Sequence, residues 1–448
     1  MSKIEVNAIE PQCGTTLTVG ASGDTITFPT GTTIVNNGSQ TGFGRTGTVD
    51  WQTGSIKTGT FTAVNGEGYF VDTSSGVSTA NLPAGSAGAI VSFADYTRTF
   101  QTNNLTITPN GSEKIGGIAS NFVALTEGQS ITLVYVDATE GWINTAESTG
   151  QAGLVAAFIV ATSPCVATVG DYKIHTFTGP GTFCVSCAGN PLGSGSVDYM
   201  VVAGGGGGGG ENSSNASGGG AGAGGYRESS GAASGCYTAS PLGAGVSALP
   251  VSVQGYSIAI GGGGTGGVGS SSYGTNGAIS TFSSITSAGG GFGGSRAPGP
   301  SVGNPGGSGG GGGLNATGGT GNTPPVSPPQ GQTGGGGTPT TSAAGGGGAG
   351  AVGGCAPSSS VAGPGGAGAT TSINATPTAR AGGGGGGGQS TGGTGGTGGG
   401  GAGANGNANG TAGADNTGGG GGGAYDTSGG STGGAGGSGI VIIRYKFQ

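Results

Sequence analysis

The sequence predicts an all-β amino-terminal region followed by a glycine-rich bundle of polyproline II helices on a small β-platform. The chain has 448 residues, of which 120 are glycine, and only 6% of its residues are charged. Ordinary globular chains contain about 7% glycine and about 25% charged residues. Residues 1–200 hold 28 glycines, so residues 201–448 hold the other 92 (120 − 28). Short alternating apolar segments fill the first half, and no sustained 3.6-residue apolar stripe appears.

These shifts in composition divide the chain into four parts. Apolar residues alternate in the first part, as at Ile4 and Val6, which is typical of short half-buried strands. Such strands bury little surface alone, so we expect several identical chains, preferably three, to share one narrow core. The parts are an oligomerisation segment over 1–45, a compact all-β domain over 46–148, a β connector over 149–203 and a glycine-rich domain over 204–448 that a carboxy-terminal strand closes.

Segments rich in β-branched and aromatic residues predict the strands. They are Gly59–Val64, Gly68–Asp72, Ala89–Asp95, Leu105–Thr108, Phe122–Leu125, Ser130–Asp137, Asp171–Thr178, Thr182–Ser186, Val197–Ala203, Tyr256–Ile260, Ala278–Ile285 and Gly439–Tyr445. Gly153–Ala161 is predicted to be either a short helix or a buried strand. The aromatic residues expected to fill the core of 46–148 are Trp51, Phe61, Phe70, Phe93, Phe100, Phe122, Tyr135 and Trp142.

Glycine-rich segments are usually flexible linkers, but three features favour order here. Nearly pure glycine runs, such as Gly204–Gly210 and Gly382–Gly388, alternate with turn-type segments. Thr391, Thr394 and Thr397 are each separated by two glycines, so they share one edge of a helix with three residues per turn, as in polyproline II. Charge is almost absent, which suits a bundle that excludes water. Without Cβ atoms, adjacent backbones can approach and satisfy one another's amides.

Charge and hydropathy exclude several classes of partner. The chain has 11 basic and 18 acidic residues, a net charge of −7, and its basic residues are isolated, so we expect neither a nucleic acid nor an anionic membrane as partner. The start, Met1–Asn7, is not followed by the apolar region of a signal peptide. The longest apolar run, Leu154–Ala161, is far shorter than the ~20 residues that span a bilayer. We expect a soluble chain made in the cytoplasm.

No catalytic, cofactor-binding or metal-binding set is expected, and the chain is not predicted to be an enzyme. Cys184 and Cys187 form a single CxxC, and His175 is the one histidine, whereas structural zinc typically takes four such ligands. We interpret these cysteines as buried or half-buried thiols on a hairpin, with Cys165 or Cys236 able to pair with one of them in an oxidising medium. His175 is interpreted as a strand residue beside Tyr172 and Phe177 rather than a triad member. The glycine runs lack the GxxxxGK[ST] pattern of a phosphate loop.

Several motifs resemble those of tailed-phage fibre proteins. Val197–Ala203 followed by Gly204–Gly210 resembles the motif that opens their glycine-rich domains, Thr176–Phe183 resembles the strand before it, and Ser438–Tyr445 resembles the closing strand. Lys3–Asn7 with Gly14–Thr18, and Asn65–Thr73 with Thr132–Asp137, are similar to virion proteins of phages that infect marine bacteria.

This resemblance implies a fibre or adhesin subunit of a virus particle, attached to other virion proteins through residues 1–45. Related adhesins form a sandwich of polyproline II helices and bind host surface receptors through loops. No receptor identity carries over, because the loops match no known binding loop residue by residue. The alternative is a purely structural appendage, such as a neck, capsid or tail fibre. Ice binding by the threonine row is a weaker third hypothesis, because one row makes a narrow face.

If the chain binds a receptor, the site should lie in the segments between the glycine runs. Tyrosine and arginine contribute interface energy more often than other residues. The candidates are Tyr226, Arg227, Tyr237, Tyr273, Phe292, Arg296, Arg380 and Tyr425. An equally good interpretation is that these side chains seal the ends of the bundle.

Overall fold

The computed structural model describes residues 25, 27, 49–146, 156–211, 216–235, 237–269, 273–295, 301–338, 341–427 and 430–448. Almost all of the segment 1–45 therefore lies outside the described residues. Strands and loops make up the described chain, and the only helix within it is one 3-10 turn, η1 (Pro241–Gly243). The predicted all-β class is confirmed for these residues.

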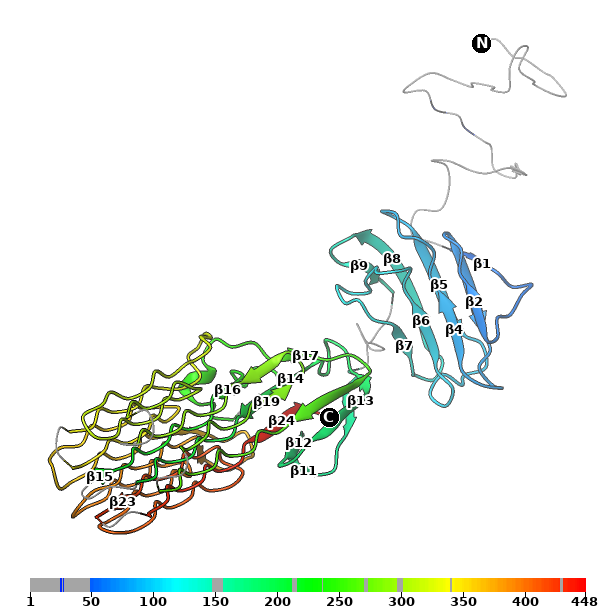
Figure 1. The fold of residues 1–448 in the computed structure, drawn as a ribbon. Helices are drawn as coiled ribbons and strands as arrows, with labels where there is room; N and C mark the ends of the chain where they lie inside the picture. Colours follow the sequence, from blue (N-terminus) through cyan, green and yellow to red (C-terminus); the bar gives the residue numbers. More distant parts are fainter. Residues whose placement is uncertain are drawn as a thin grey trace, which may run out of the picture.

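Residues 49–146 form a two-sheet sandwich (Figure 1). One sheet has the order β1-β3-β5-β8-β9 and the other the order β2-β4-β6-β7. The first six strands alternate between the sheets, and within each sheet they pair in parallel. The strands are β1 (Asp50–Trp51), β2 (Thr60–Thr62), β3 (Glu67–Val71), β4 (Ser78–Asn81), β5 (Ile90–Asp95), β6 (Leu105–Thr108), β7 (Phe122–Ala124), β8 (Ser130–Asp137) and β9 (Gly141–Asn144).

The core of this sandwich lies between the two sheets and contains most of the expected aromatic residues. Phe93, Phe100, Phe122 and Trp142 are fully buried, while Phe61 and Tyr135 pack against them from the margin. The prediction was wrong for Trp51 and Phe70, which lie on the outer face. Side chains alternate along β3, so Tyr69 occupies the core and its neighbour Phe70 points away.

The second unit, 156–448, contains two larger sheets. One has the order β10-β13-β18-β19-β20 and the other β11-β12-β24-β14-β16, with β17 also paired to β14. The strands are β10 (Ile159–Thr162), β11 (Val166–Val169), β12 (Tyr172–Phe177), β13 (Gly181–Ala188), β14 (Ser196–Val202), β15 (Ala216–Ser217), β16 (Tyr226–Glu228), β17 (Leu249–Pro250), β18 (Gly255–Ala259), β19 (Ser280–Phe282), β20 (Ile285–Ser287), β21 (Ala369–Thr371), β22 (Thr378–Arg380), β23 (Tyr425–Asp426) and β24 (Ile440–Lys446).

The carboxy-terminal strand β24 lies between β12 and β14 and is antiparallel to both. Its sheet is covered on both faces. Val441 and Ile443 join a core with the opposite sheet, whereas Ile440 and Ile442 face buried alanines of the glycine-rich part. A strand buried on both faces has a continuous apolar sequence rather than an alternating one, which explains the run Ile440–Ile443.

Two strand predictions differ from the structure. The segment Ala278–Ile285 is a hairpin, β19 and β20, because Ser283 adopts a left-handed φ of 53° and turns the chain. Gly153–Ala161 contributes its described end to β10, where Ile159 is buried but Val160 is 53% exposed, so its described part is neither the predicted helix nor a buried strand. Residues 153–155 lie outside the described residues.

The glycine-rich segments are held together by backbone hydrogen bonds with a repeat of three residues. Along 204–210, every third amide donates to the same neighbouring segment, and the residues between donate to two others. Gly204 and Gly207 donate to Ala278 and Thr275, Gly205 and Gly208 to Gly437 and Gly434, and Gly206 and Gly209 to Gly222 and Gly219. The carbonyl groups of this segment accept hydrogen bonds with the same three-residue repeat, from segments 264–267, 290–293 and 421–424. One segment therefore has six bonded neighbours.

Close backbone contact explains why these segments are glycine. A Cβ at Gly207 would overlap the carbonyl oxygen of Thr265, and one at Gly208 would overlap that of Gly422. The run 382–388 is enclosed in the same way, with bonds to 398–404, 363–366, 218–221, 420–423, 343–346 and 393–396. By contrast, Thr391, Thr394 and Thr397 are exposed, and the glycines between them are buried or half-buried. In 204–210 and 382–388 unbroken glycine accompanies an enclosed segment, whereas in 391–397 a side chain at every third position accompanies an exposed edge.

Candidate functional site

The glycine-rich segments run back and forth between the sheets and a far end. Figure 1 shows the pair β15 and β23 at the end of the bundle opposite β12, β14 and β24. The chain enters the bundle from β14 and leaves it into β24, so it enters and leaves at the sheet end. The strands β15 and β23 therefore lie at the end of the bundle far from that point.

Loops at the far end are tied together by asparagine side chains. Asn407 Oδ1 accepts a hydrogen bond from the Thr427 amide at 3.0 Å, and Asn409 Oδ1 accepts one from the Thr432 amide at 2.8 Å. The Asn407 Nδ2 group donates to Thr427 Oγ1 at 2.6 Å. These amide groups fix Asn407 and Asn409 against Thr427 and Thr432, so the described residues around them present a polar surface.

Three of the predicted receptor residues lie in the far half of the bundle or its loops. Tyr273 is 42% exposed, whereas Tyr425, in β23, is 1% exposed, and its burial raises the pKa of the phenol. Phe292 is half-buried in the segment 289–294. Arg296 lies outside the described residues. Among the described candidates in the far half of the bundle, Tyr273 thus has the most exposed side chain.

The other four candidates lie at the sheet end. Tyr226 in β16 and Arg380 in β22 are buried, at 1% and 6% exposure. Arg227 and Tyr237 are half-buried, and the Tyr237 ring lies 5.1 Å from the guanidinium carbon of Arg444. The structure therefore does not bring the seven described candidates together. It divides them between two ends, and the buried ones occupy the interior, as in the end-sealing interpretation.

A buried carboxylate that the sequence did not single out organises the sheet end. Glu228 accepts hydrogen bonds from Tyr226 OH at 2.9 Å, from the Ser240 amide at 3.0 Å and from Thr371 Oγ1. Burial raises the pKa of Glu228, while these hydrogen bonds oppose the shift. Burial, together with the charge and hydrogen bond of Glu228, raises the pKa of Tyr226 well above its usual value. The network joins β16 to η1 and β21.

Asp198, inside the apolar strand β14, is the second such residue. It is fully buried and accepts four hydrogen bonds from one loop. The donors are Ser229 Oγ at 2.7 Å, the Gly231 amide at 3.1 Å, the Ser234 amide at 2.7 Å and Ser234 Oγ at 2.6 Å. A charged residue within a strand that is otherwise apolar was the sequence signal for this role, because a buried charge must be paired or hydrogen-bonded.

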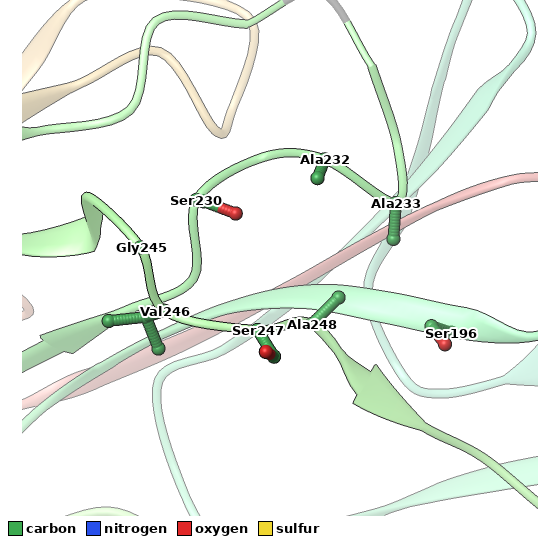
Figure 2. Close-up of a pocket in the computed structure, with 8 residues that line it drawn as sticks. All are labelled: Ser196, Ser230, Ala232, Ala233, Gly245, Val246, Ser247 and Ala248. Carbon is green, nitrogen blue, oxygen red and sulfur yellow. The ribbon is translucent and has the colours of Figure 1, made fainter.

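The loop that Asp198 shapes forms one wall of an open hollow of about 400 Å³ (Figure 2). The other walls are Ser196 of β14 and residues 245–248. Figure 2 shows the hydroxyl groups of Ser230 and Ser247 among small apolar side chains. The lining contains no charged residue and none of the eight predicted receptor residues. Its chemistry suits only weak contacts with a neutral group.

His175 is a buried residue of β12. Its Nδ1 lies 2.7 Å from Ser163 Oγ, and its Nε2 lies 3.2 Å from Tyr445 OH. Burial, and secondarily the charge of Lys173, lowers the pKa of His175 to about 4. The imidazole is therefore neutral near pH 7, packed edge-on to Phe183. Its place in a strand agrees with the interpretation from sequence.

The cysteines form no constellation among the described residues. Cys165, Cys184, Cys187 and Cys355 are free thiols, and Cys184 and Cys187 lie on β13. Cys13 and Cys236 lie outside the described residues. In the part of the chain that the structure covers, no three His, Cys, Asp or Glu side chains gather into a metal-binding group. Within the same residues, no helix has the length and apolar character needed to cross a membrane.

A comparison with protein-family models matches a glycine-rich domain over residues 177–446, more than half of the chain. The match begins at the last residue of β12 and ends at the last residue of β24. The matched region therefore includes the bundle and the strands from β13 to β24, whereas β10, β11 and all but the last residue of β12 precede it. No curated protein matches the sequence. The chain belongs to the family defined by this glycine-rich domain.

Proposed function

We propose that this chain is a structural, non-catalytic fibre subunit of a tailed-phage particle that recognises a host-surface receptor through the far-end loops of its glycine-rich bundle. The observation that carries the proposal is the position of those loops. The chain enters and leaves the bundle at the sheet end. The hydrogen-bonded backbone segments of the bundle therefore separate the loops at β15 and β23 from that end.

We further propose that the glycine-rich segments are polyproline II helices. A polyproline II helix has three residues per turn and makes no internal hydrogen bonds, so its amides and carbonyls point outward in three directions. The three-residue rhythm of the bonds along 204–210 and 382–388 supports this geometry. So do the exposed Thr391, Thr394 and Thr397, which lie one turn apart on one edge.

The location on a virion and the homo-oligomeric state, with a trimer preferred, rest on the sequence motifs. In this proposal residues 1–45 attach the chain to other virion proteins. A structural appendage without receptor binding is the alternative, and the burial of Tyr226, Arg380 and Tyr425 favours it for those three side chains. Tyr273 and the asparagine-rich loops are then the surface on which recognition depends.

Competition during adsorption tests the proposal. Purified chain should slow adsorption of the parent phage to its host, because it occupies the receptor. Tyr273→Ala should weaken this competition several-fold. Leu125→Ala is the matched control, because it trims a large side chain of similar exposure, 41% against 42%, in the 49–146 sandwich and away from the bundle. If the chain is found on the particle but neither it nor antibodies against its far end affect adsorption, the structural alternative replaces the adhesin.

A further inference from the structure

The two outer faces of the 49–146 sandwich differ in chemistry. Because side chains alternate along a strand, the neighbours of each core residue face outward. On the sheet β2-β4-β6-β7 the outward residues are mostly threonine: Thr60, Thr62, Thr79, Asn81, Thr106, Thr108 and Val123. On the sheet β1-β3-β5-β8-β9 the polar outward residues are Ser92, Ser130 and Thr132, and the apolar ones are the larger set: Trp51, Phe70, Ile90, Ala94, Val134, Val136 and Ile143. We name the second set, with Tyr96, the apolar face.

Aromatic rings form a row on this face. Trp51 lies 4.9 Å from Phe70, and Phe70 lies 6.4 Å from Tyr96, measured between ring centroids. Trp51 is 36% exposed and Tyr96 is 56% exposed. A Cβ at Gly68 would lie 2.8 Å from the Trp51 ring, so the glycine allows the indole to lie down on the sheet. Large exposed apolar patches on soluble proteins mark interaction sites.

The centre of the apolar face can lose water at little cost. Ile90, Val134 and Ile143 stand opposite one another on three adjacent strands and form an aliphatic row. The polar pair in the next row, Ser92 and Thr132, hydrogen-bond to each other at 2.8 Å. Burying a hydroxyl is costly only when it lacks a partner, so these two hydroxyls do not require solvent.

Charge favours a second copy as the occupant. The charged residues of these five strands, all within the described chain, each stand at the first or last position of a strand: Asp50, Glu67, Asp95 and Asp137. The outward positions between them carry no charge. Identical copies bring identical charges together, and like charges in contact are costly. A face without charge in its middle can therefore contact the same face of a second copy without bringing like charges together.

We propose, as a refinement of the homo-oligomer proposed above, that the apolar face is the surface through which copies of this chain associate. The sheet begins at β1, directly after the segment 1–45 that we expect copies to share. Contact between copies across the apolar face would extend that shared core. Soluble homo-oligomers usually have closed rotational symmetry, and such contacts are compatible with it. The threonine-rich face of the other sheet stays in water.

Light scattering on the full chain tests this inference. Tyr96→Glu with Val136→Glu places two charges on the apolar face, at side chains 56% and 49% exposed, so folding should tolerate them. Val64→Glu with Val77→Glu is the matched control, because these side chains are 53% and 66% exposed in loops away from the face. The wild type and the control should be oligomers, and the first variant should associate at least tenfold more weakly.

Tryptophan fluorescence provides a second readout. The chain has two tryptophans, and Trp142 is fully buried, so quenching by acrylamide reports mainly on Trp51. Quenching should be weak in the wild-type oligomer and strong in the Tyr96→Glu/Val136→Glu variant. A wild-type monomer would overturn both this inference and the homo-oligomer. An oligomer that keeps its mass in that variant, with Trp51 readily quenched, would overturn this inference alone.

Discussion

Tyr445 stacks on His175 with ring centroids 5.4 Å apart, and its hydroxyl lies 3.2 Å from Nε2 of the histidine. The two residues lie on β24 and β12, the neighbouring strands that bring together the two ends of the glycine-rich unit. Ser163 Oγ contacts the other ring nitrogen. The neutral imidazole of His175 therefore lies where β12 meets β24. Its protonation should weaken the packing between these two strands.

Acid should destabilise this unit through His175. The pKa of His175 is lowered from 6.5 to about 4 in the fold, so between these values the unfolded chain binds the extra proton. The stabilisation is present above pH 6.5 and is lost as the pH falls toward 4. A shift of that size corresponds to about 3 kcal/mol of unfolding free energy. Denaturant titrations across this pH window measure it.

The variant His175→Gln isolates this effect, because glutamine does not titrate yet can hydrogen-bond to Ser163 and Tyr445. Carboxylates titrate in both proteins, so their contributions cancel in the difference. The wild type should lose stability relative to the variant as the pH falls. Parallel pH profiles for the two proteins would show that His175 does not titrate as argued.

Enclosed glycines should tolerate no side chain. In Gly207→Ala the new methyl group meets the carbonyl of Thr265, which is backbone and cannot move aside. Overpacking of this kind costs roughly 1–3 kcal/mol, because the neighbouring segment must shift and its hydrogen bonds weaken. Urea denaturation of the purified variant gives the change.

Gly262→Ala is the matched control, since a Cβ at Gly262 has open space around it and no left-handed φ is required. Its unfolding free energy should stay within about 0.5 kcal/mol of the wild type. Equal effects of the two substitutions would mean that contact between backbones is not what excludes alanine.

Replacement of Asp198 should disorder the sheet end. Asp198→Asn keeps the size of the side chain but leaves an NH₂ group facing donors from Ser229, Gly231 and Ser234. Loss of acceptors for buried donors costs about 1–3 kcal/mol per group left unpaired. We expect lower stability and faster proteolysis in the loop 229–235. Asp415→Asn, at an exposed carboxylate with one 3.3 Å bond to the Ser438 amide, should change neither.

The sequence predicted the β class and most strands because their apolar patterns are local. Ile131 and Leu133 alternate with polar neighbours, and this pattern alone indicates a strand with one buried face. The glycine-rich half was predictable to the level of order and a three-residue repeat, since Thr391, Thr394 and Thr397 display the period directly. Which segments neighbour one another was not predictable, because glycine has no side chain to distinguish one partner from another.

The candidate site was less predictable for a related reason. Tyr226 and Tyr425 are tyrosines beside glycine runs, but a tyrosine at the end of an enclosed segment can turn inward as easily as outward. The direction depends on long-range neighbours, such as Glu228 for Tyr226, whose position follows from the fold. Phe70 shows the same limit within a strand, where a shift of one residue exchanges the inner face for the outer.

Amide exchange should reveal whether the glycine-rich segments are as stable as the sheets. Each amide from Gly204 to Gly209 donates to a backbone carbonyl of another segment at 2.8–3.1 Å. Such amides exchange only when the structure opens. We expect protection of the same order as that of Met200–Val202 in β14, which continues directly into this segment. If Gly204–Gly209 exchange as fast as an unfolded peptide while β14 stays protected, the bonds between glycine segments do not hold the bundle, and its shape must come from the sheets alone.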